Sequence, residues 1–499
     1  MCPSLQRQLL PTGLPVLPGL RLAAGCLLAE ADETAGGDWF DAVPLPGGRV
    51  ALVVGDVVGR GVPASATMAQ LRAVVQDRLD ETGEVLPALA AADRLATRLP
   101  AAHAATVCIV VLTPGDGALV CGSAGHPPPL VTGGGRARYL PVPASGPLGT
   151  HATYTTTADR LGGDEVVLLY SDGIIERPGR DPGEATAEFA RVTTEAVADA
   201  EPGTSAVERA CTRTLDRLVR ATGTADDIAL LGAQRVAPAG PLRLHLPADV
   251  SVVRVARGEL TRWLEELAVG EDDQFALLHA VNELVTNAVE HSHPDSLGGT
   301  VSVTGTLDDT GVVHIEVADD GSWHERSWPA SVEVRREQGL GLAMTSQFVD
   351  RLDFDRGAGG TTATIHHRLV RPARLVSAGD VAGGRATAGG PAEMTLIVEQ
   401  PHAPSSRIAV HGPLDVTSSD QFARELEALT MGYSHPLTVD LTAVTHFASA
   451  AIAVLHRATT RDHRNGTALR LYAPVGSPAH HVLSLVDLPH TTVDPHRPA

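Results

Sequence analysis

The sequence predicts a multidomain α+β chain with three domains, on three observations. The chain has 499 residues, which is too long for one hydrophobic core. Two segments rich in glycine, alanine and proline, residues 237–241 and 371–393, interrupt it. Elsewhere short Val/Leu/Ile runs alternate with turn residues and with helical periodicity. The predicted units are a residual N-terminal helix and linker at 1–19, domains at 20–235, 241–370 and 394–499, and a flexible linker at 371–393.

The bulk composition excludes several classes of protein. No uninterrupted apolar run reaches the roughly 18 residues that a membrane span needs, and the N-terminus lacks the pattern of a signal peptide. We therefore expect a cytoplasmic protein with no membrane partner. Five scattered cysteines without a C-x-x-C pair argue against a disulfide framework and against zinc. A net charge of −20 would repel a phosphate backbone, so we expect no direct binding of nucleic acid.

Acidic residues recur in the first domain where short apolar runs meet turn signals. There are four such places: Asp38 after Gly36-Gly37, Asp56 after residues 51–54, Asp172 after residues 166–170, and Asp226-Asp227 before residues 228–231. Helices are predicted at 64–82 and 85–98. A single Asp-Gly pair is common turn chemistry. In a sheet sandwich, however, strand ends bring remote carboxylates to one edge, where they suit hard divalent cations such as Mn²⁺ or Mg²⁺.

Six signatures in this order resemble the metal-dependent (PPM-type) serine/threonine protein phosphatases, in particular the SpoIIE branch. They are residues 36–41, 55–64, 124–128, 146–149, 169–173 and 226–228. The resemblance covers residues 1–235. It implies a β-sandwich fold and the removal of phosphate from phosphoserine or phosphothreonine.

The resemblance also implies the residues of the phosphatase site. Asp38 and Asp56 would hold two Mn²⁺ or Mg²⁺ ions about 3.5 to 4 Å apart, with the Val57 carbonyl assisting. Asp172 and Asp226 would complete one side, and of the pair Asp226-Asp227 we predict the first as the ligand. A bridging water would attack phosphorus directly, so that no Cys or Ser nucleophile is needed.

His126 permits two interpretations. A histidine beside a phosphatase site suggests a general acid. Three prolines follow it, however, and they favour a structural turn. The turn is the interpretation that we prefer.

The second domain begins with a predicted strand at 242–246 and a predicted amphipathic helix at 250–267. A stronger helix is predicted at 273–291, with an acidic N-terminus and an apolar stripe at three- and four-residue spacings. Glu283 and Asn287 are four residues apart and so share one face of this helix. An amide oxygen there suits Mg²⁺ with nucleotide phosphates, and a carboxylate suits activation of a hydroxyl.

Further signatures follow in an order that resembles the GHKL (Bergerat-type) α/β ATPase sandwich of gyrase, heat-shock chaperones and histidine kinases. They are Asp319 with Gly321, Gly339 with Gly341, and the Gly-Thr-Thr run that contains Thr361. The size of the domain and residues 281–291 are most similar to the anti-sigma-factor serine kinases. The resemblance implies ATP with Mg²⁺ on Asn287, activation of an acceptor serine by Glu283, adenine recognition by Asp319 and phosphates over the two glycines.

One departure from that family is Trp323, where a second glycine is usual. We therefore expect the lid beside the nucleotide to differ. No histidine of this domain lies in a phosphoacceptor context, which argues against histidine-kinase chemistry.

The last domain alternates strands and helices and resembles the small α/β STAS domain of anti-sigma-factor antagonists. The resemblance rests on residues 412–415, on Asp440-Leu441 and on the loop before a helix at 450–459. In phosphorylatable members that loop carries Asp-Ser-Ser or Asp-Ser-Thr. Here Ala448 replaces the aspartate and Ala450 the usual acceptor. Our hypothesis is a docking module that cannot be released by phosphorylation; the alternative is that Ser449 accepts phosphate in spite of the offset.

The sequence therefore predicts a partner-switching regulator of a sigma factor. Its partners would be a phosphorylated anti-sigma-factor antagonist and a sigma factor or anti-sigma kinase. One alternative is a non-catalytic scaffold that sequesters a sigma factor or an antagonist through its kinase-like and STAS domains. Another is an ATPase of unrelated purpose, which the two neighbouring domains argue against.

Overall fold

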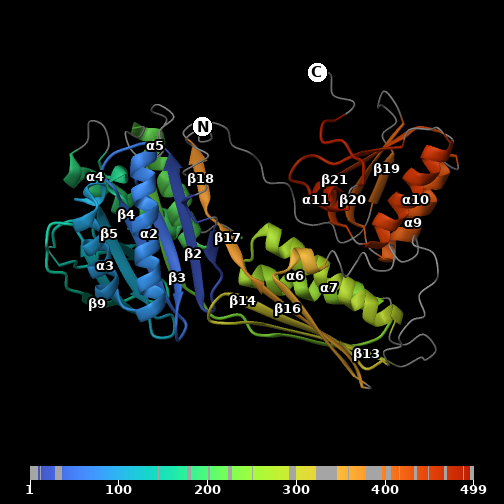
Figure 1. Ribbon diagram of the computed structural model, residues 1–499, viewed down its shortest axis with the longest axis horizontal. Helices are drawn as coiled ribbons and strands as arrows, with labels where there is room; N and C mark the ends of the chain where they lie inside the picture. The colour runs from blue at the N-terminus through green and yellow to red at the C-terminus, as the bar shows by residue number, and fades with distance from the viewer. Residues whose placement is uncertain are drawn as a thin grey trace.

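Three α/β bodies follow one another along the chain (Figure 1). This computed structural model describes residues 9–11, 13–28, 36–143, 145–176, 181–199, 203–222, 227–249, 251–291, 299–321, 345–357, 359–377, 396–399, 406–414, 416–431, 435–447, 449–465, 469–486 and 488–494. Within these ranges no helix combines the length and the apolar character needed to cross a bilayer.

The N-terminal domain is a sandwich of two mainly antiparallel sheets. One sheet contains, in order, β3 (Trp39–Leu45), β4 (Arg49–Asp56), β5 (Thr106–Leu112), β6 (Ala118–Ala124) and β9 (Thr157–Arg160). The other contains β18 (Arg374–Ser377), β2 (Leu20–Leu28), β11 (Ile228–Arg235), β10 (Val166–Tyr170), β7 (Leu130–Gly133) and β8 (Arg136–Tyr139). Helices α2 (Val62–Thr82) and α3 (Val85–Arg98) pack on the first sheet.

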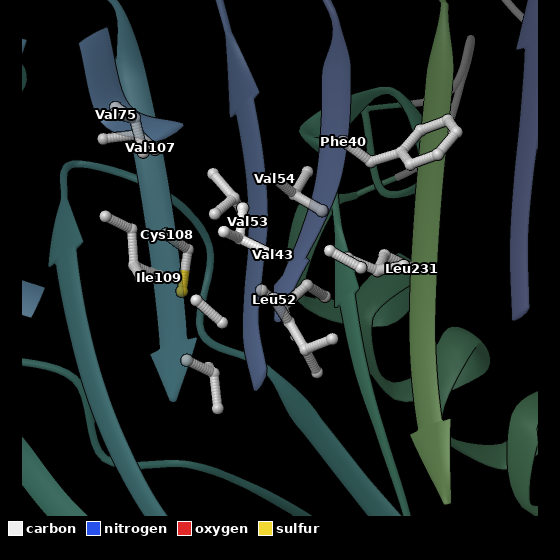
Figure 2. Close-up of a cluster of buried hydrophobic side chains, with 14 of the residues drawn as sticks. Phe40, Val43, Leu52, Val53, Val54, Val75, Val107, Cys108, Ile109 and Leu231 are labelled. Atoms are coloured by element: carbon white, nitrogen blue, oxygen red, sulfur yellow. The ribbon is translucent and has the colours of Figure 1, made fainter. Parts of the chain in front are cut away.

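The core of this domain lies between the two sheets. Phe40, Leu52 and Val54 of the first sheet lie near Leu231 of the second (Figure 2). On the outer face of the first sheet, Val75 of α2 lies beside Val107. Strands β4 and β5 are buried along almost their whole length because helices cover one face and a sheet covers the other. Because the facing sheets are closely packed, the strand ends of one sheet keep a fixed position relative to the strand ends of the other.

The predicted helices at 64–82 and 85–98 are confirmed by α2 and α3. The prediction of only two helices in this domain was wrong, because α4 (Pro182–Ala198) and α5 (Ala206–Thr222) cover the second sheet. Helix α4 begins at a clear N-cap, since Asp181 accepts the backbone N–H groups of Gly183 and Glu184. Its threonines and alanines dilute the apolar periodicity by which helices are usually recognised.

In its described residues the middle domain is one antiparallel sheet with two helices packed on it. The sheet order is β12 (Leu242–Pro247), β13 (Thr300–Leu307), β14 (Val312–Asp319), β16 (Gly360–Arg368) and β15 (Arg351–Gly357). The helices are α6 (Ser251–Leu267) and α7 (Glu271–His291), as the periodicity predicts. The predicted stripe on α7 packs in the core with the sheet, through Val281, Val285 and Ala288.

The C-terminal domain has the predicted alternation of strands and helices. Its sheet contains β19 (Leu396–Glu399), β20 (Arg407–Leu414), β21 (Leu437–Phe447) and β22 (Leu469–Tyr472), with α9 (Val416–Leu429), α10 (Ser449–Asn465) and α11 (Pro478–Leu485). Phe275 of α7 and Phe348 pack against its core from the middle domain, and the Phe348 ring lies 5.5 Å from that of His481. The two domains therefore share an aromatic contact.

The prediction of a flexible linker beginning at residue 371 was wrong for residues 371–377. β17 (Val370–Pro372) pairs with β1 (Gly13–Pro15), and β18 joins the sheet of the N-terminal domain beside β2. Figure 1 shows the orange strand β18 next to the blue strand β2. Residues 371–377 contain no glycine and include the apolar pair Leu375-Val376, so the Gly/Ala-rich composition belongs to the residues that follow them. So short an apolar run does not reveal that it pairs with a strand of a remote domain. Residues 378–393 lie outside the described residues, as does most of the predicted N-terminal helix.

Candidate functional site

Asp38 and Asp56 are brought together by the pairing of β3 with β4. Trp39 pairs with Gly55, so the preceding residue on one strand lies opposite the following residue on the other. A hydrogen bond joins the two carboxyl groups, one of which carries the shared proton. Asp38 is only 5 % exposed, and Asp56 is half-buried. The first two predicted ligands therefore meet at the rim of one sheet.

The glycines before Asp38 permit two close approaches. A Cβ on Gly36 would lie 1.8 Å from an Asp227 carboxylate oxygen, and a Cβ on Gly37 would lie 2.1 Å from the Val57 carbonyl oxygen. Neither distance can accommodate a side chain. The Gly37 carbonyl in turn accepts the Val57 N–H at 3.3 Å. Because residues 36–37 have no side chains, the Val57 carbonyl, the third predicted ligand, lies close to the backbone that leads into Asp38.

Ser171 connects the second sheet to this pair of carboxylates. Its hydroxyl donates to Asp38 Oδ2 at 2.6 Å and accepts the Ala229 N–H at 2.9 Å. Ser171 is fully buried, and its own N–H donates to the Ala229 carbonyl at 3.0 Å. The serine thus fixes the orientation of Asp38 from the end of β10. Sequence reasoning did not select Ser171, although its position one residue before Asp172 was a usable signal.

Of the two remaining predicted ligands, Asp172 and Asp226, the structure describes only the first. Asp172 directly follows Ser171 and is half-buried at the start of a short 3-10 helix, Asp172–Ile174. Asp226 lies outside the described residues. Its neighbour Asp227, which we did not select, is 6 % exposed and acts electrostatically on Asp38. In the described part of the chain no three His, Cys, Asp or Glu side chains form a ready-made metal cage.

The electrostatics of the pair are those of crowded carboxylates. Burial raises the pKa of Asp38 well above its ordinary value, and the charges of Asp56 and Asp227 raise it further. The hydrogen bond from Ser171 opposes that shift. Carboxylate and carbonyl oxygens that face each other in a buried place fit a divalent cation, because positive charge relieves both the repulsion and the desolvation. The donor set present here therefore suits Mn²⁺ or Mg²⁺ and not a soft metal.

His126 has a structural role. Its Nε2 lies 3.0 Å from the Tyr170 carbonyl oxygen, which can only accept, so Nε2 carries the proton. The Nδ1 atom then accepts from the Thr106 hydroxyl at 2.8 Å. Burial lowers the pKa of His126 to about 4. A neutral ring with both nitrogens engaged supports the turn interpretation and not a general acid.

The middle domain places several predicted nucleotide residues at one end of its sheet. Asp319 ends β14, pairs with Thr361 on β16 and accepts the Gly321 N–H at 3.0 Å. Glu283 is 5 % exposed and Asn287 half-buried on α7, which packs on β13 and β14. Gly339, Gly341 and Trp323 lie outside the described residues, so their predicted roles stay predictions.

In the C-terminal domain, Asp440 belongs to an ion-pair network and not to a loop site. Its carboxylate binds Arg407 at 2.6 Å, and Arg407 also binds Asp494 at 2.7 Å. Ser449 and Ala450 begin α10, although the structure does not describe their side chains, and Ala448 lies outside the described residues. The loop hypothesis therefore stays a prediction.

Each of the three domains matches a known protein family. Residues 46–236 match the family model of stage II sporulation protein E (SpoIIE), residues 246–366 that of a histidine kinase-like ATPase domain, and residues 398–490 that of the Mlab STAS domain.

Among solved structures, the RsbU and RsbW domains of Rv1364c from Mycobacterium tuberculosis are 39 % identical to the chain, with a TM-score of 0.66 over 74 % of this chain and 98 % of that one. The PP2C phosphatase domain of SpoIIE from Bacillus subtilis, with a fragment of its regulatory domain, is 14 % identical, with a TM-score of 0.38 over 44 % and 65 % of the two chains. The catalytic domain of the phosphatase PstP with two manganese ions is 18 % identical, with a TM-score of 0.32 over 44 % and 98 %.

Removal of the Ser171 hydroxyl should loosen Asp38 and leave the Ala229 N–H without its partner. We expect Ser171→Ala to weaken Mn²⁺ binding roughly tenfold or more, since groups that orient ligands typically contribute this much. Isothermal titration with Mn²⁺ measures the effect. Thr193→Val is the control, because it removes a fully buried hydroxyl from α4, away from Asp38. Equal Mn²⁺ affinity in Ser171→Ala and the wild type would contradict the assigned role.

The buried His126 predicts an acid-labile N-terminal domain. The unfolded chain takes up a proton at His126 near pH 6.5, whereas the folded chain does so at about pH 4. The stabilisation is therefore complete above pH 6.5 and falls as the pH drops from 6.5 to 4, by about 3 kcal/mol in all. Urea unfolding across this range measures it. His126→Gln keeps a donor and an acceptor but does not titrate, so its unfolding free energy should depend less steeply on pH; an unchanged slope would refute the assignment.

Proposed function

The chain belongs to the family of the fused RsbU- and RsbW-domain proteins, and from this premise we propose that it is a metal-dependent protein phosphatase within a partner-switching system. Its substrate is a phosphoserine or phosphothreonine on a separate STAS-type antagonist protein. Dephosphorylation of that antagonist frees it to bind an anti-sigma kinase, and a sigma factor is released as a result. The kinase-like and STAS domains of this chain supply the docking surfaces for these partners.

One observation carries the phosphatase proposal. Asp38 and Asp56 lie opposite each other on adjacent strands and share a hydrogen bond in a buried place. Two acidic side chains placed together and partly out of solvent cost free energy unless positive charge or a proton accompanies them. Asp38 is instead bound by the neutral hydroxyl of Ser171, which keeps its carboxylate available as an oxygen ligand.

The residues of the chain have distinct parts in this chemistry. A bound pair of divalent cations supplies positive charge for the phosphate and acidifies a water molecule. Asp38 and Asp56 hold that charge in place, and the Val57 carbonyl adds a neutral oxygen. Asp172 and Asp226 are proposed to complete the set. Ser171 holds Asp38 in one rotamer, so that no reorganisation of this ligand is required when substrate binds.

A covalent thiol mechanism does not fit this domain. All four cysteines in the described part of the chain are buried. Burial raises the pKa of the Cys26 thiol well above its ordinary value, and the nearby charges of Asp227 and Asp38 raise it further. A thiol that stays protonated is a poor nucleophile. Attack by a water molecule is therefore the route that this proposal requires.

The middle domain is proposed to bind ATP with Mg²⁺ and to act as a serine kinase or as an anti-sigma module. Its support is the cluster of Asp319, Gly321 and Thr361 at one sheet end, together with the buried Glu283 of α7. A carboxylate held in a dry place is well suited to accept a proton from a serine hydroxyl. Asn287 is the proposed Mg²⁺ ligand on the same helix.

The scaffold alternative has an observation of its own in its favour. The C-terminal domain packs on the middle domain through Phe348 and His481, whose rings are 5.5 Å apart. A STAS domain already docked there, with Ala448 and Ala450 in its loop, would occupy a partner surface without being released by phosphorylation. Phosphatase turnover distinguishes the two functions, because a scaffold needs none.

The phosphatase proposal is tested by replacing one ligand at a time. Asp38→Asn and Asp172→Asn should each lower Mn²⁺-dependent release of phosphate from a phosphorylated antagonist by roughly a hundredfold or more, because a neutral amide binds a divalent cation poorly. Asp41→Asn is the matched control. Asp41 belongs to the same motif but binds Arg72 at 2.9 Å, so its loss should affect stability and leave turnover within a few fold. Wild-type phosphate release by Asp38→Asn would contradict the proposal.

The STAS hypothesis is tested by incubating the full chain with ATP and Mg²⁺ and mapping the phosphorylated residues by mass spectrometry. We expect no stoichiometric phosphate on Ser449, because the acceptor position is occupied by Ala450. The control is Ala450→Ser, which restores a hydroxyl at the usual position and should become phosphorylated if the middle domain is an active kinase. Stoichiometric phosphate on Ser449 in the wild type would end the docking hypothesis.

A further inference from the structure

The sheet of the N-terminal domain is completed by a strand that the chain supplies only after it has passed through the middle domain. β18 lies parallel to β2, with Arg374 opposite Gly25 and Ser377 opposite Leu28. It is the outermost strand in the sheet order. Figure 1 shows the orange strand lying along the blue one. Residues 370–377 therefore belong structurally to the phosphatase domain as much as to the ATPase domain.

The segment is held firmly where it leaves the middle domain. The Val370 N–H donates to the Asp273 carboxylate at 2.6 Å, at the start of α7. Arg371 forms an ion pair with Glu208 of α5. Pro372 pairs with Gly13 in the ribbon formed by β17 and β1. The path of the chain into β18 is thus set by contacts with both domains.

β2, the strand that β18 flanks, is the neighbour of β11 in the sheet whose strand ends carry residues of the proposed phosphatase site. Its other neighbour is β11, where Leu27 pairs with Ile228 and Cys26 with Ala229. Asp227 immediately precedes this pairing. The Ala229 N–H binds the Ser171 hydroxyl, which in turn binds Asp38. An uninterrupted run of backbone and side-chain hydrogen bonds therefore leads from β18 through β2 and β11 to the carboxylates.

Removal of β18 would make β2 the edge of the sheet. Edge strands have one row of unpaired backbone groups and open more readily than strands paired on both sides. The ends of β18 and β2 that would open, at Ser377 and Leu28, lie at the edge where β11 begins beside Asp227. Loss of order there would reach Asp38 through Ala229 and Ser171.

We propose that β18 is a positioning element of the phosphatase site, supplied from beyond the ATPase domain, so that the carboxylates reach full metal affinity only when this strand is paired with β2. This inference rests on the proposed phosphatase function. It goes beyond that function because it makes the two domains one catalytic unit. The strand's residues are not among the proposed metal ligands; they act through β2 and β11.

The experiment uses two proline variants of the full-length chain, Leu375→Pro and Val376→Pro. Successive residues of a strand direct their N–H groups to opposite sides, so one of these N–H groups points towards β2 and the other points away from the sheet. Proline removes the N–H in both variants, but it breaks the hydrogen-bond ladder between β18 and β2 only where that N–H points towards β2. We call this one the ladder-breaking variant. The two variants therefore serve as matched controls for each other.

We expect the ladder-breaking variant to bind Mn²⁺ about tenfold more weakly, an effect typical of lost ligand orientation, and the other variant to resemble the wild type. Hydrogen exchange, followed by mass spectrometry, should show faster exchange in residues 20–28 and 36–41 of the first variant alone. ATP-analogue binding by the middle domain should be equal in both. Equal Mn²⁺ affinity and equal exchange in the two variants would overturn the proposal.

A further variant separates positioning from simple domain docking. Arg21→Ala removes contacts from β2 to the Leu267 carbonyl, at 3.1 Å, and to the Glu266 carbonyl at the end of α6. It leaves the pairing of β18 with β2 intact. If β18 acts through the sheet, Arg21→Ala keeps wild-type Mn²⁺ affinity. A loss equal to that of the ladder-breaking variant would show that domain docking alone is responsible and would refute the role of the strand.

The outcome is separable from that of the phosphatase proposal. If the wild type releases no phosphate from any phosphorylated antagonist, the proposed function fails, but Mn²⁺ affinity and hydrogen exchange still report on the strand. If the wild type is active and both proline variants match it in kcat, KM and Mn²⁺ requirement, the positioning role fails while the phosphatase stands. If the ladder-breaking variant does not fold, the protein depends on β18 more globally than proposed, and the specific role is refuted.

Discussion

Two carboxylates that oppose each other in a buried place, Asp38 and Asp56, are the constraint on which the N-terminal domain depends. Their mutual repulsion and their desolvation both work against folding. The domain keeps them there through strong backbone pairing of β3 with β4 and through a hydroxyl from another sheet. Either a proton or a cation relieves such an arrangement, so the same geometry that disfavours two negative charges also suits divalent cations.

The sandwich is what makes this meeting of residues possible. Asp38 and Asp56 come from one sheet, whereas Ser171 and Asp227 come from strands of the other. Close packing between the sheets, with Phe40 and Leu231 in the core, holds the two rims in register. A slip of one residue in β3 would turn Asp38 to the opposite face and bring its neighbour into its place. The apolar core therefore determines the geometry of the polar site, although none of its side chains takes part in the chemistry.

Strong local patterns made part of this structure predictable. The helices α3 and α6 have clear apolar periodicity and α7 carries an apolar stripe. The pair Asp38 and Asp56 could be found because each borders a buried strand and a glycine turn. The nearness of Asp227 could not be read in the same way, because adjacent acids at one strand end give no sign of which side chain turns inwards. Helix α4 was missed since threonine and alanine dilute its apolar face. Helix α5 was missed although Val207, Cys211, Leu215 and Leu218 form a clear apolar stripe that the sequence analysis did not use.

The crossing strand shows a more general limit of sequence reasoning about domains. Backbone pairing needs no particular side chain, and the four residues of β18 are too few for a strand pattern to stand out from the linker that follows them. Prediction from composition separates the chain into consecutive domains. Here, however, the second sheet of the phosphatase domain receives its outermost strand only after the chain has passed through the ATPase domain. Contacts such as that of the Val370 N–H with Asp273 fix the path of the returning chain, and they form no sequence motif. It follows that the functional unit of this protein is larger than any of its sequence-defined domains: the phosphatase rim, the ATPase helix α7 and the strand between them are held by one set of hydrogen bonds.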